Sequence, residues 1–226
     1  MEMEVNGYRI EPGADLAGAH LKGENLSGED LEGANLEGAN LRRAELIGTN
    51  LRRANLKGAD LSRADLQNYD EADDWMFDYD ERRSDEAFVL ETDLSRADLS
   101  GARLRGADLR RANLWEANLS GADLQEANLS GACLYSANLT GACLNGANFS
   151  DTRMSGANLS GASLFLTDLS SADLTGVNLT GTDLSETHLH RADLSGANLT
   201  GVDLSETHLD DAYLTGATMP DGSIHE

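Results

Sequence analysis

The sequence predicts an all-β solenoid, in which the chain winds into stacked coils of short extended segments. From Leu94 to Met219, a large apolar residue recurs at every fifth position, and it is almost always leucine. The residue two positions earlier is small, usually alanine, and the residue directly before is mostly Asp or Asn. A spacing of five fits neither an α-helix nor the alternation of a strand over many turns. Each pentapeptide is therefore predicted to be a structural unit of its own.

Each unit is expected to be an extended segment followed by a corner. Alternate residues of extended backbone point to the same side, so the leucine and the small residue two positions earlier both point inward. Gly and Ser, which are common after the leucine, suit a corner where the backbone needs unusual angles. The inward side chains are thus predicted to fill a central column and to leave no ligand cavity.

The repeated A-[D/N]-L-x-x pattern resembles the pentapeptide-repeat family. The resemblance implies a right-handed quadrilateral β-helix, with four pentapeptides in each coil and one on each face of a square prism. On that basis the repeats amount to about nine coils and a rod roughly 44 Å long. The C-terminal tail is similar to the tails of family members from photosynthetic bacteria.

One solenoid domain is expected, in five consecutive parts. They are an N-terminal cap (1–13), coils (14–68), an inserted acidic, aromatic loop (69–91), further coils (92–219) and a C-terminal cap (220–226). In the first cap, Val5, Tyr8 and Ile10 alternate, which predicts a short strand laid over the first coil. In the last cap, a Pro-Asp-Gly turn signal is expected to let Ile224 fold back over the final coil.

Two carboxylates, Glu24 and Glu29, occupy inward positions where the pattern places a small residue. Burying a carboxylate is costly unless it is paired or protonated. We expect both side chains to tilt toward water or to accept hydrogen bonds from backbone amides beneath the N-terminal cap. A buried functional carboxylate is the alternative.

The insertion is the candidate recognition element. Leu66 and Leu94 are 28 positions apart, which is not a multiple of five. Residues 69–91 contain ten acidic residues, two arginines and five of the eleven aromatic residues of the chain. Aromatic residues anchor protein interfaces, and carboxylates favour a basic partner. The candidate partner-binding residues are Asp73, Asp74, Trp75, Phe77, Asp78, Tyr79 and Asp80.

An intramolecular role for the insertion is the alternative. Outward arginines gather in the coils on both sides of it, and the acidic segment could fold back on them. Exposed ion pairs contribute little each, so burial of the aromatic residues would decide the outcome. The arginines before the insertion are Arg42, Arg43, Arg52, Arg53 and Arg63, and those after it are Arg96, Arg103, Arg105, Arg110 and Arg111.

The composition excludes several classes of function. The formal net charge is −23, which opposes direct binding to nucleic acid phosphates and suits a basic partner; adaptation to salt is the other explanation of such acidity. The sequence has no apolar run long enough for a membrane span, and the N-terminus is not a secretory signal. Cys133 and Cys143 are expected on opposite sides of a coil, as free thiols of a cytoplasmic protein.

Late in the chain, residues 181–190 recur almost unchanged as 201–210. The interval equals one predicted coil, so His188 is expected to stack on His208 and Glu186 on Glu206. Stacked imidazoles and carboxylates could hold a metal ion, but no pocket completes a coordination shell. A side-chain ladder left by duplication of a repeat is the favoured interpretation.

The sequence points to a non-enzymatic protein-interaction scaffold, with no catalytic motif, no cofactor and no metal. The alternative is a DNA mimic that binds gyrase or topoisomerase, as in the quinolone-resistance branch of the family. The acidity and the projecting loop favour the mimic, whereas the arginines around the insertion oppose it. That branch commonly dimerises through an apolar C-terminal helix, which this tail lacks, so a monomer is expected rather than a dimer.

Overall fold

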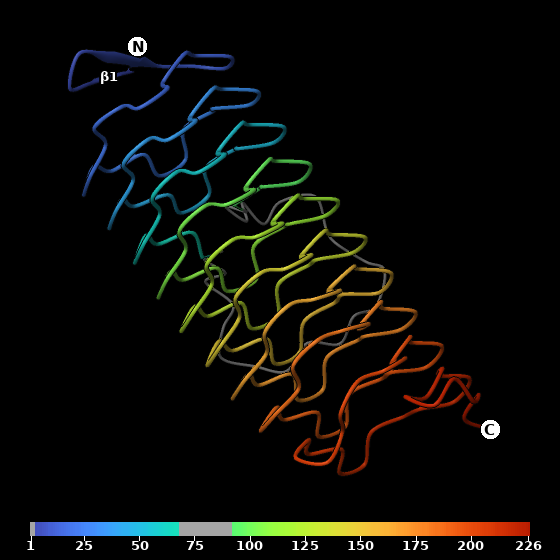
Figure 1. Cartoon of the computed structure of the whole chain (residues 1–226). Helices are drawn as coiled ribbons and strands as arrows, with labels where there is room; N and C mark the ends of the chain where they lie inside the picture. Colours follow the sequence, from blue (N-terminus) through green and yellow to red (C-terminus); the bar gives the residue numbers. More distant parts are fainter. Residues whose placement is uncertain (1–2, 68–91) are drawn as a thin grey trace, which may run out of the picture.

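The computed structural model describes residues 3–67 and 92–226, which form a prism of stacked coils with the two ends of the chain at opposite ends of the stack (Figure 1). Parallel bridges join residues 20 positions apart, such as Asp15 to Asn35 and Asn35 to Asn55. One turn of the prism therefore takes four pentapeptides. Each bridge centres on the residue before the large apolar one, where the short extended segment lies.

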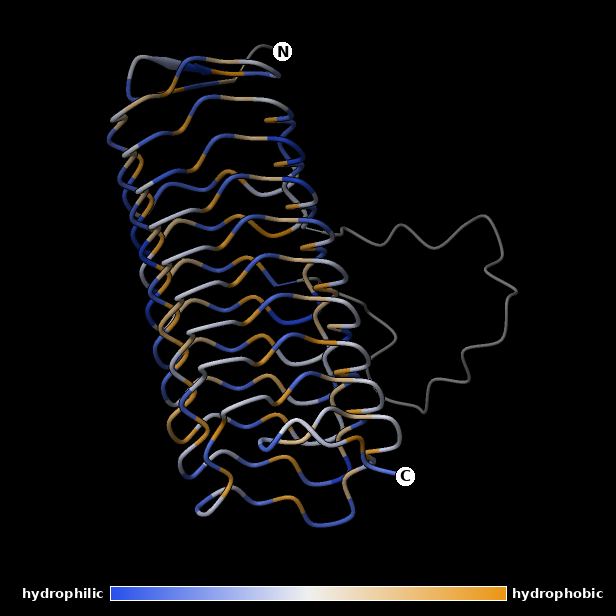
Figure 2. Cartoon of the chain, turned by 45° about the vertical axis from the view of Figure 1, so that its right-hand side comes forward, coloured by the Kyte–Doolittle hydropathy of each residue, from blue (hydrophilic) through white to orange (hydrophobic). Residues whose placement is uncertain are grey.

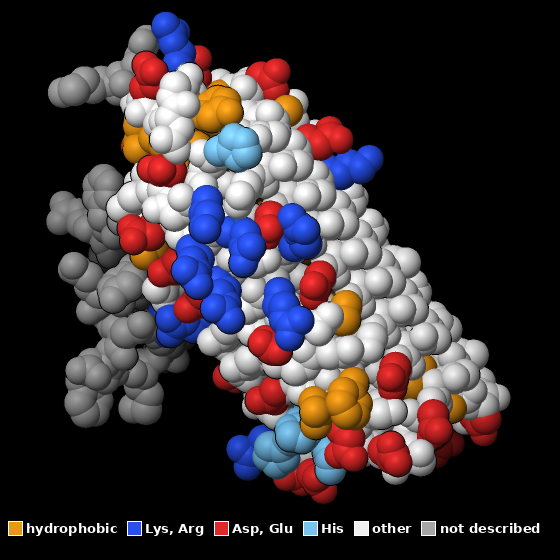
Figure 3. Space-filling model, turned by 60° about the vertical axis from the view of Figure 1, so that its left-hand side comes forward, with side chains coloured by type: hydrophobic (Ala, Val, Ile, Leu, Met, Phe, Trp, Pro, Cys, Tyr) orange, Lys and Arg blue, Asp and Glu red, His pale blue; other side chains and the backbone are white. Residues whose placement is uncertain are grey.

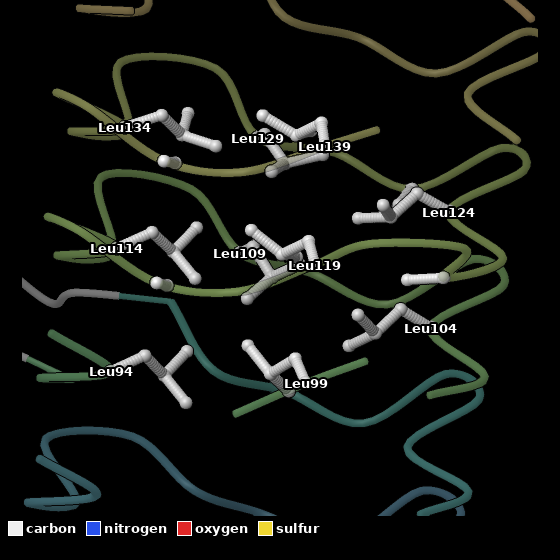
Figure 4. Packing of buried hydrophobic residues seen from close by; sticks show 14 of the residues in the cluster. Leu94, Leu99, Leu104, Leu109, Leu114, Leu119, Leu124, Leu129, Leu134 and Leu139 are labelled. Atoms are coloured by element: carbon white, nitrogen blue, oxygen red, sulfur yellow. The ribbon is translucent and has the colours of Figure 1, made fainter. Parts of the chain in front are cut away.

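The prism has four faces, which we name after the first leucine on each: the Leu16, Leu21, Leu26 and Leu31 faces. Leucines of successive coils stack in columns behind each face (Figure 4). Leu94, for example, lies in line with Leu114 of the next coil on the Leu31 face. Figure 2 shows the apolar segments recurring in register from coil to coil.

The interior is filled by leucine and alanine, most of them fully buried. Phe149 and Met154 replace leucine in the column and are equally buried. Where threonine takes the small inward position, its hydroxyl bonds a backbone carbonyl, as Thr167 does to Leu144 at 2.9 Å. Every buried side-chain nitrogen and oxygen in the described residues has a hydrogen-bond partner. The core thus avoids the cost of an unpaired polar group.

The corners explain the preference for Asp or Asn and for Gly. At one corner, the backbone N–H of Ala97 donates to the carbonyl of Leu94 at 3.0 Å, which closes a β-turn. The side chain of Asp93 accepts a bond from the N–H of Ser95 at 2.9 Å. The residue before the alanine has a positive φ, 60° at Arg96, and glycine adopts this conformation most easily. Similar bonds recur along the prism.

The N-terminal end is covered by an antiparallel hairpin rather than by the single short strand that alternation predicts. Strand β1 (Met3–Val5) pairs with β2 (Tyr8–Ile10). Asn6 and Gly7 connect them with φ of 52° and 82°, the positive values that an Asn-Gly hairpin turn requires. The Asn-Gly dipeptide was the missed signal. Val5 and Ile10 are buried against the first coil.

The two inward glutamates lie at this end and are only partly buried. The side-chain amide of Asn6, in the hairpin turn, donates to Glu24 Oε1 at 3.0 Å. Glu24 is therefore bonded beneath the cap, but by a side-chain amide rather than by the expected backbone amides. The same amide nitrogen also lies 3.0 Å from the carbonyl oxygen of His20, so one side chain ties the hairpin to the first coil.

At the C-terminal end the chain turns at Gly222, and Ile224 pairs antiparallel with Thr218. The fold-back expected for the tail is present, but the Ile224 side chain is 61% exposed and covers little of the core. The backbone pairing runs along only one edge of the last coil, so Leu204, Leu209 and Leu214 remain only partly buried.

Cys133 and Cys143 are free and belong to opposite faces, since they bridge to Arg153 and Ser163 in separate columns. Among the described residues, no helix is long and apolar enough to cross a membrane.

Candidate protein-interaction surface

The recognition residues predicted from sequence lie outside the described residues. They are Asp73, Asp74, Trp75, Phe77, Asp78, Tyr79 and Asp80. The structure does show where the described coils stop and resume, which we call the junction. They stop at Gln67 on the Leu26 face and resume at Thr92, just before the Leu31 face. The candidate surface is therefore built from the coils on either side of this junction.

The bridge register shows how much chain the junction accommodates. Asn50 pairs with Asp93 and Asn55 with Asp98, both 43 positions apart instead of 20. The difference is 43 − 20 = 23 residues, the length of segment 69–91. Leu51 and Leu94 nevertheless occupy successive coils of one face, so the column continues in register across the junction.

Thr92 holds the junction together. The side chain is fully buried, and its hydroxyl lies 3.1 Å from the carbonyl oxygen of Leu46 and 3.3 Å from that of Gln67. The same oxygen accepts a bond from the N–H of Gly48 at 2.9 Å. The Thr92 hydroxyl therefore links the two sides of the junction, Gln67 and Thr92, to each other and to Leu46 and Gly48 in the preceding coil.

Arginines surround this junction on three faces of the prism. Figure 3 shows Lys and Arg side chains gathered in one area of the side that it presents. We call the arginines around the junction the arginine belt. It consists of Arg42, Arg43, Arg52, Arg53, Arg63, Arg96, Arg103, Arg105, Arg110 and Arg111. Five of these occupy corner positions with φ between 57° and 60°, where glycine would be less strained, namely Arg43, Arg53, Arg63, Arg96 and Arg111.

Asp60 is the buried centre of the belt on the Leu21 face. Its side chain is only 12% exposed and lies 2.9 Å from Arg103 Nη2 in the next coil and 3.9 Å from Arg42 Nε in the previous one. Ser62 donates to the same carboxylate from its backbone N–H at 3.1 Å and from its hydroxyl at 2.6 Å. These contacts fix the carboxylate, while both arginines keep about half or more of their side chains exposed.

Other arginines of the belt are held along the prism in a similar way. Arg105 Nη2 lies 2.7 Å from Glu126 Oε1, and this hydrogen bond, with the charge of Glu126, raises the pKa of Arg105 above its ordinary value. Arg110 contacts both carboxylate oxygens of Asp108 at 2.9 and 3.0 Å and also donates to the side chain of Gln67. The belt thus presents positively charged groups in fixed places on a chain that is acidic overall.

Aromatic residues on the Leu31 face were missed by the sequence reasoning. Trp115 is 36% exposed, and the Arg96 guanidinium lies 4.4 Å from the centre of its ring while also pairing with Glu116 at 2.8 Å. One coil further, the Arg153 guanidinium lies 6.0 Å from the ring centre of Tyr135. The sequence did contain a signal for them. Trp115 and Tyr135 directly follow a leucine of the repeat, at an outward position that is otherwise mostly polar.

The histidine ladder forms as the repeat duplication predicts. His188 and His208 bridge in successive coils, with ring centres 5.0 Å apart and planes at 74°. Glu186 lies diagonally from His208, with Oε2 3.5 Å from Nε2. No group of three or more metal-ligating side chains lies together within residues 3–67 and 92–226.

The comparisons with known proteins identify the family. A model of pentapeptide repeats matches eight overlapping copies that together cover residues 13–68 and 92–221. The chain therefore belongs to the pentapeptide-repeat family, whose members fold as right-handed quadrilateral β-helices. A comparison with curated proteins gave no match.

Several solved structures are similar to this chain. HetL, a pentapeptide-repeat protein involved in heterocyst differentiation regulation from the cyanobacterium Nostoc sp. strain PCC 7120, is 33% identical, with a TM-score of 0.52. That alignment covers 95% of this chain and 92% of HetL. Rfr23 from the cyanobacterium Cyanothece 51142 is 28% identical over 75% of this chain and 90% of its own, with a TM-score of 0.36. QnrB1, a plasmid-mediated fluoroquinolone resistance protein, is 21% identical over 84% and 88%, with a TM-score of 0.39.

Proposed function

We propose that this protein is a non-enzymatic scaffold for protein–protein interaction, a rod of about nine coils in which residues 69–91 form the recognition element. The observation that carries the proposal is that, within each pentapeptide, the inward residues fill the core and the outward residues vary. Apart from Glu24 and Glu29 in the first coil, the inward positions of residues 14–67 and 92–219 are apolar or hold hydrogen-bonded threonine, so this part of the interior offers no ligand site. Chemically distinct side chains are confined to the outside, where a partner can reach them.

The distribution of charge supports a partner-binding role near the junction. The arginine belt gives way after residue 111 to a strongly acidic region, in which residues 112–226 contain fifteen Asp and Glu against two Arg. The acidic region 112–226 favours a partner with a basic surface, and the net charge of the chain opposes direct binding of nucleic acid. HetL is described as involved in a regulatory process, which agrees with action through binding. We infer a cytoplasmic monomer.

The test compares capture of partners by the intact chain and by three variants. Deletion of 69–91 and the triple change W75A/F77A/Y79A should both abolish capture of a specific partner. The quadruple change D73N/D74N/D78N/D80N should weaken it most at low salt. Tyr213→Ser, which removes an exposed aromatic residue near the C-terminal end of the prism, is the control and should leave capture unchanged. Equal recovery after the deletion would exclude the segment as the recognition element.

A gyrase-binding DNA mimic is the second candidate, favoured by the acidity and length of the rod and by the insertion at 69–91. The arginine belt opposes it, because a continuous negative surface is what would imitate a duplex. We expect no inhibition of supercoiling by purified gyrase at micromolar protein. Inhibition, or protection from quinolones, would favour the mimic over the scaffold.

A further inference from the structure

Two apolar residues protrude side by side on the corner between the Leu21 and Leu26 faces. Phe165 is 42% exposed and Leu166 is 52% exposed. The equivalent corner residues of neighbouring coils are polar or lack a side chain, namely Asn145 and Gly146 before them and Ser185 and Glu186 after them. Figure 3 shows a hydrophobic patch beside the histidine side chains at this corner, below the arginines. The pair forms a small raised apolar site on an otherwise polar edge.

The backbone at this site is unfavourable for a leucine. Leu166 has φ of 56°, a left-handed conformation that glycine accepts readily and a leucine does not. Other non-glycine corner residues with positive φ are Arg, Glu, Ser or Asp, so Leu166 is the one apolar side chain at such a corner within the described residues. Neither burial nor conformational preference explains a leucine there, and strained residues of this kind gather at functional sites.

The corner is also held in place by bonds from the neighbouring coils. The β-turn of this corner is closed as elsewhere, but position 163 is serine, so the Phe165 N–H has no Asp or Asn oxygen two positions before it. Instead, Asn145 Oδ1 of the previous coil accepts a bond from the N–H of Phe165 at 3.1 Å. The Ser163 hydroxyl donates to the same oxygen at 2.6 Å. The N–H of Leu166 lies 3.3 Å from the carbonyl oxygen of Ser185. The two apolar side chains are thereby presented on fixed backbone, which lowers the entropy cost of binding.

The charges around the pair define the partner. On the Leu21 face from residue 123 to residue 206, the outward charged residues are all acidic and comprise Asp123, Glu126, Asp183, Glu186, Asp203 and Glu206. This described stretch of the face carries no lysine or arginine. On the Leu26 side of the corner the charged residues are mixed and include Asp151, Asp168 and Arg191. An apolar contact bordered by carboxylates along the Leu21 face complements an apolar pocket whose facing rim carries lysine or arginine, since charge pairs at a rim steer association and exclude wrong partners.

We propose that Phe165 and Leu166 form a second docking site, which inserts into an apolar, basic-rimmed pocket of a partner protein. The proposal rests on the scaffold function but names a surface distinct from segment 69–91. The site has the features of an interface anchor, with apolar side chains at its centre and charged groups around them. A second copy of this chain is a poorer occupant, because its acidic surface would repel this one.

The variant F165S/L166G separates binding from folding. It gives the corner the Ser-Gly pair already present at Ser195 and Gly196, and glycine relieves the strain at position 166. The melting temperature should therefore stay level or rise, whereas binding should weaken at least about tenfold. Tyr213→Ser is the control for loss of an exposed aromatic residue on another face and should change the dissociation constant less than about twofold.

To identify the partner, the full chain with Phe165→p-benzoylphenylalanine is expressed in its native cells and crosslinked by ultraviolet light. The crosslinked protein is identified, and the free partner is then purified and titrated with the wild-type chain and with F165S/L166G. A crosslinked protein that binds the wild-type chain, loses affinity for F165S/L166G and binds more weakly at high salt supports the site. No crosslinked product, crosslinks only between copies of this chain, or equal affinity for F165S/L166G would overturn it. A partner lost on deletion of 69–91 but retained by F165S/L166G would leave the scaffold function intact and refute this site alone.

Discussion

The hydroxyl of Thr92 lies 3.3 Å from the carbonyl oxygen of Gln67, although the two residues are 25 positions apart in the sequence. The contact brings the two sides of the junction to the spacing of an ordinary corner. Leu66 and Leu94 then lie on consecutive faces, as any two consecutive leucines of the repeat do. The prism is therefore continuous in structure where the sequence is interrupted.

Deletion of residues 69–91 should accordingly leave the prism folded. The shortened sequence reads Leu66-Gln67-Asn68-Thr92-Asp93-Leu94, an ordinary pentapeptide step, and it removes the entropy cost of closing a longer loop. We expect an unchanged circular dichroism spectrum and a melting temperature equal to or above that of the intact chain. A lower melting temperature would mean that the segment contributes contacts that stabilise the coils.

Thr92→Val should destabilise the junction, because valine keeps the shape but cannot bond Gly48, Leu46 or Gln67. The Leu46 carbonyl still accepts a bond from Thr49, but the loss of the three Thr92 hydroxyl bonds should lower the free energy of unfolding by about 1–3 kcal/mol, as measured by urea denaturation. Thr200→Val is the matched control, since Thr200 is exposed and its hydroxyl bonds only the side chain of Asn198. Equal effects of the two changes would show that the junction bonds contribute nothing special.

The sequence predicted the repeat well and its surface less well. Inward positions follow one rule almost throughout, apart from Glu24, Glu29 and a few threonines, because the same column selects leucine and alanine. Leu119 or Ala122 could therefore be assigned without coordinates. Outward positions obey no such rule. The Asp60 contacts join coils through side-chain rotamers, and the fixing of Phe165 by Asn145 depends on a serine that replaces the usual Asp or Asn. Neither follows from spacing alone.

Asp60→Asn should test whether the arginine belt is anchored by its buried carboxylate. The change keeps the size of the side chain and removes its attraction for Arg103 and Arg42. We expect a loss of about 1 kcal/mol in the free energy of unfolding that shrinks as salt is added. Asp98→Asn is the control at the same repeat position, where the carboxylate bonds Ser100 and Asn118. A salt-independent effect would argue against an ionic contribution.

The C-terminal turn should loosen in acid. The hydroxyl of Ser223 donates to Asp221 at 2.6 Å and its backbone N–H at 2.9 Å, and these bonds lower the pKa of Asp221 below its ordinary value. Because the folded pKa lies below the unfolded one, the stabilisation is present above about pH 4 and is lost as the pH falls through the folded pKa. The protection factor of the Met219 amide, which donates to the carbonyl of Ser223, should therefore fall below that range when exchange is compared with the intrinsic rate at each pH.

Ser223→Ala should raise the pKa of Asp221, followed by NMR, toward its ordinary value, because the Ser223 hydroxyl bond is the main cause of the lowered pKa. Protection of the Met219 amide should then depend less on pH. Ser195→Ala is the control, because the bond that Ser195 makes to Asp193 comes from its backbone N–H at 2.9 Å and survives the change. An Asp221 titration unmoved by Ser223→Ala would show that the hydroxyl does not set its pKa, and that the turn owes its acid response to another group.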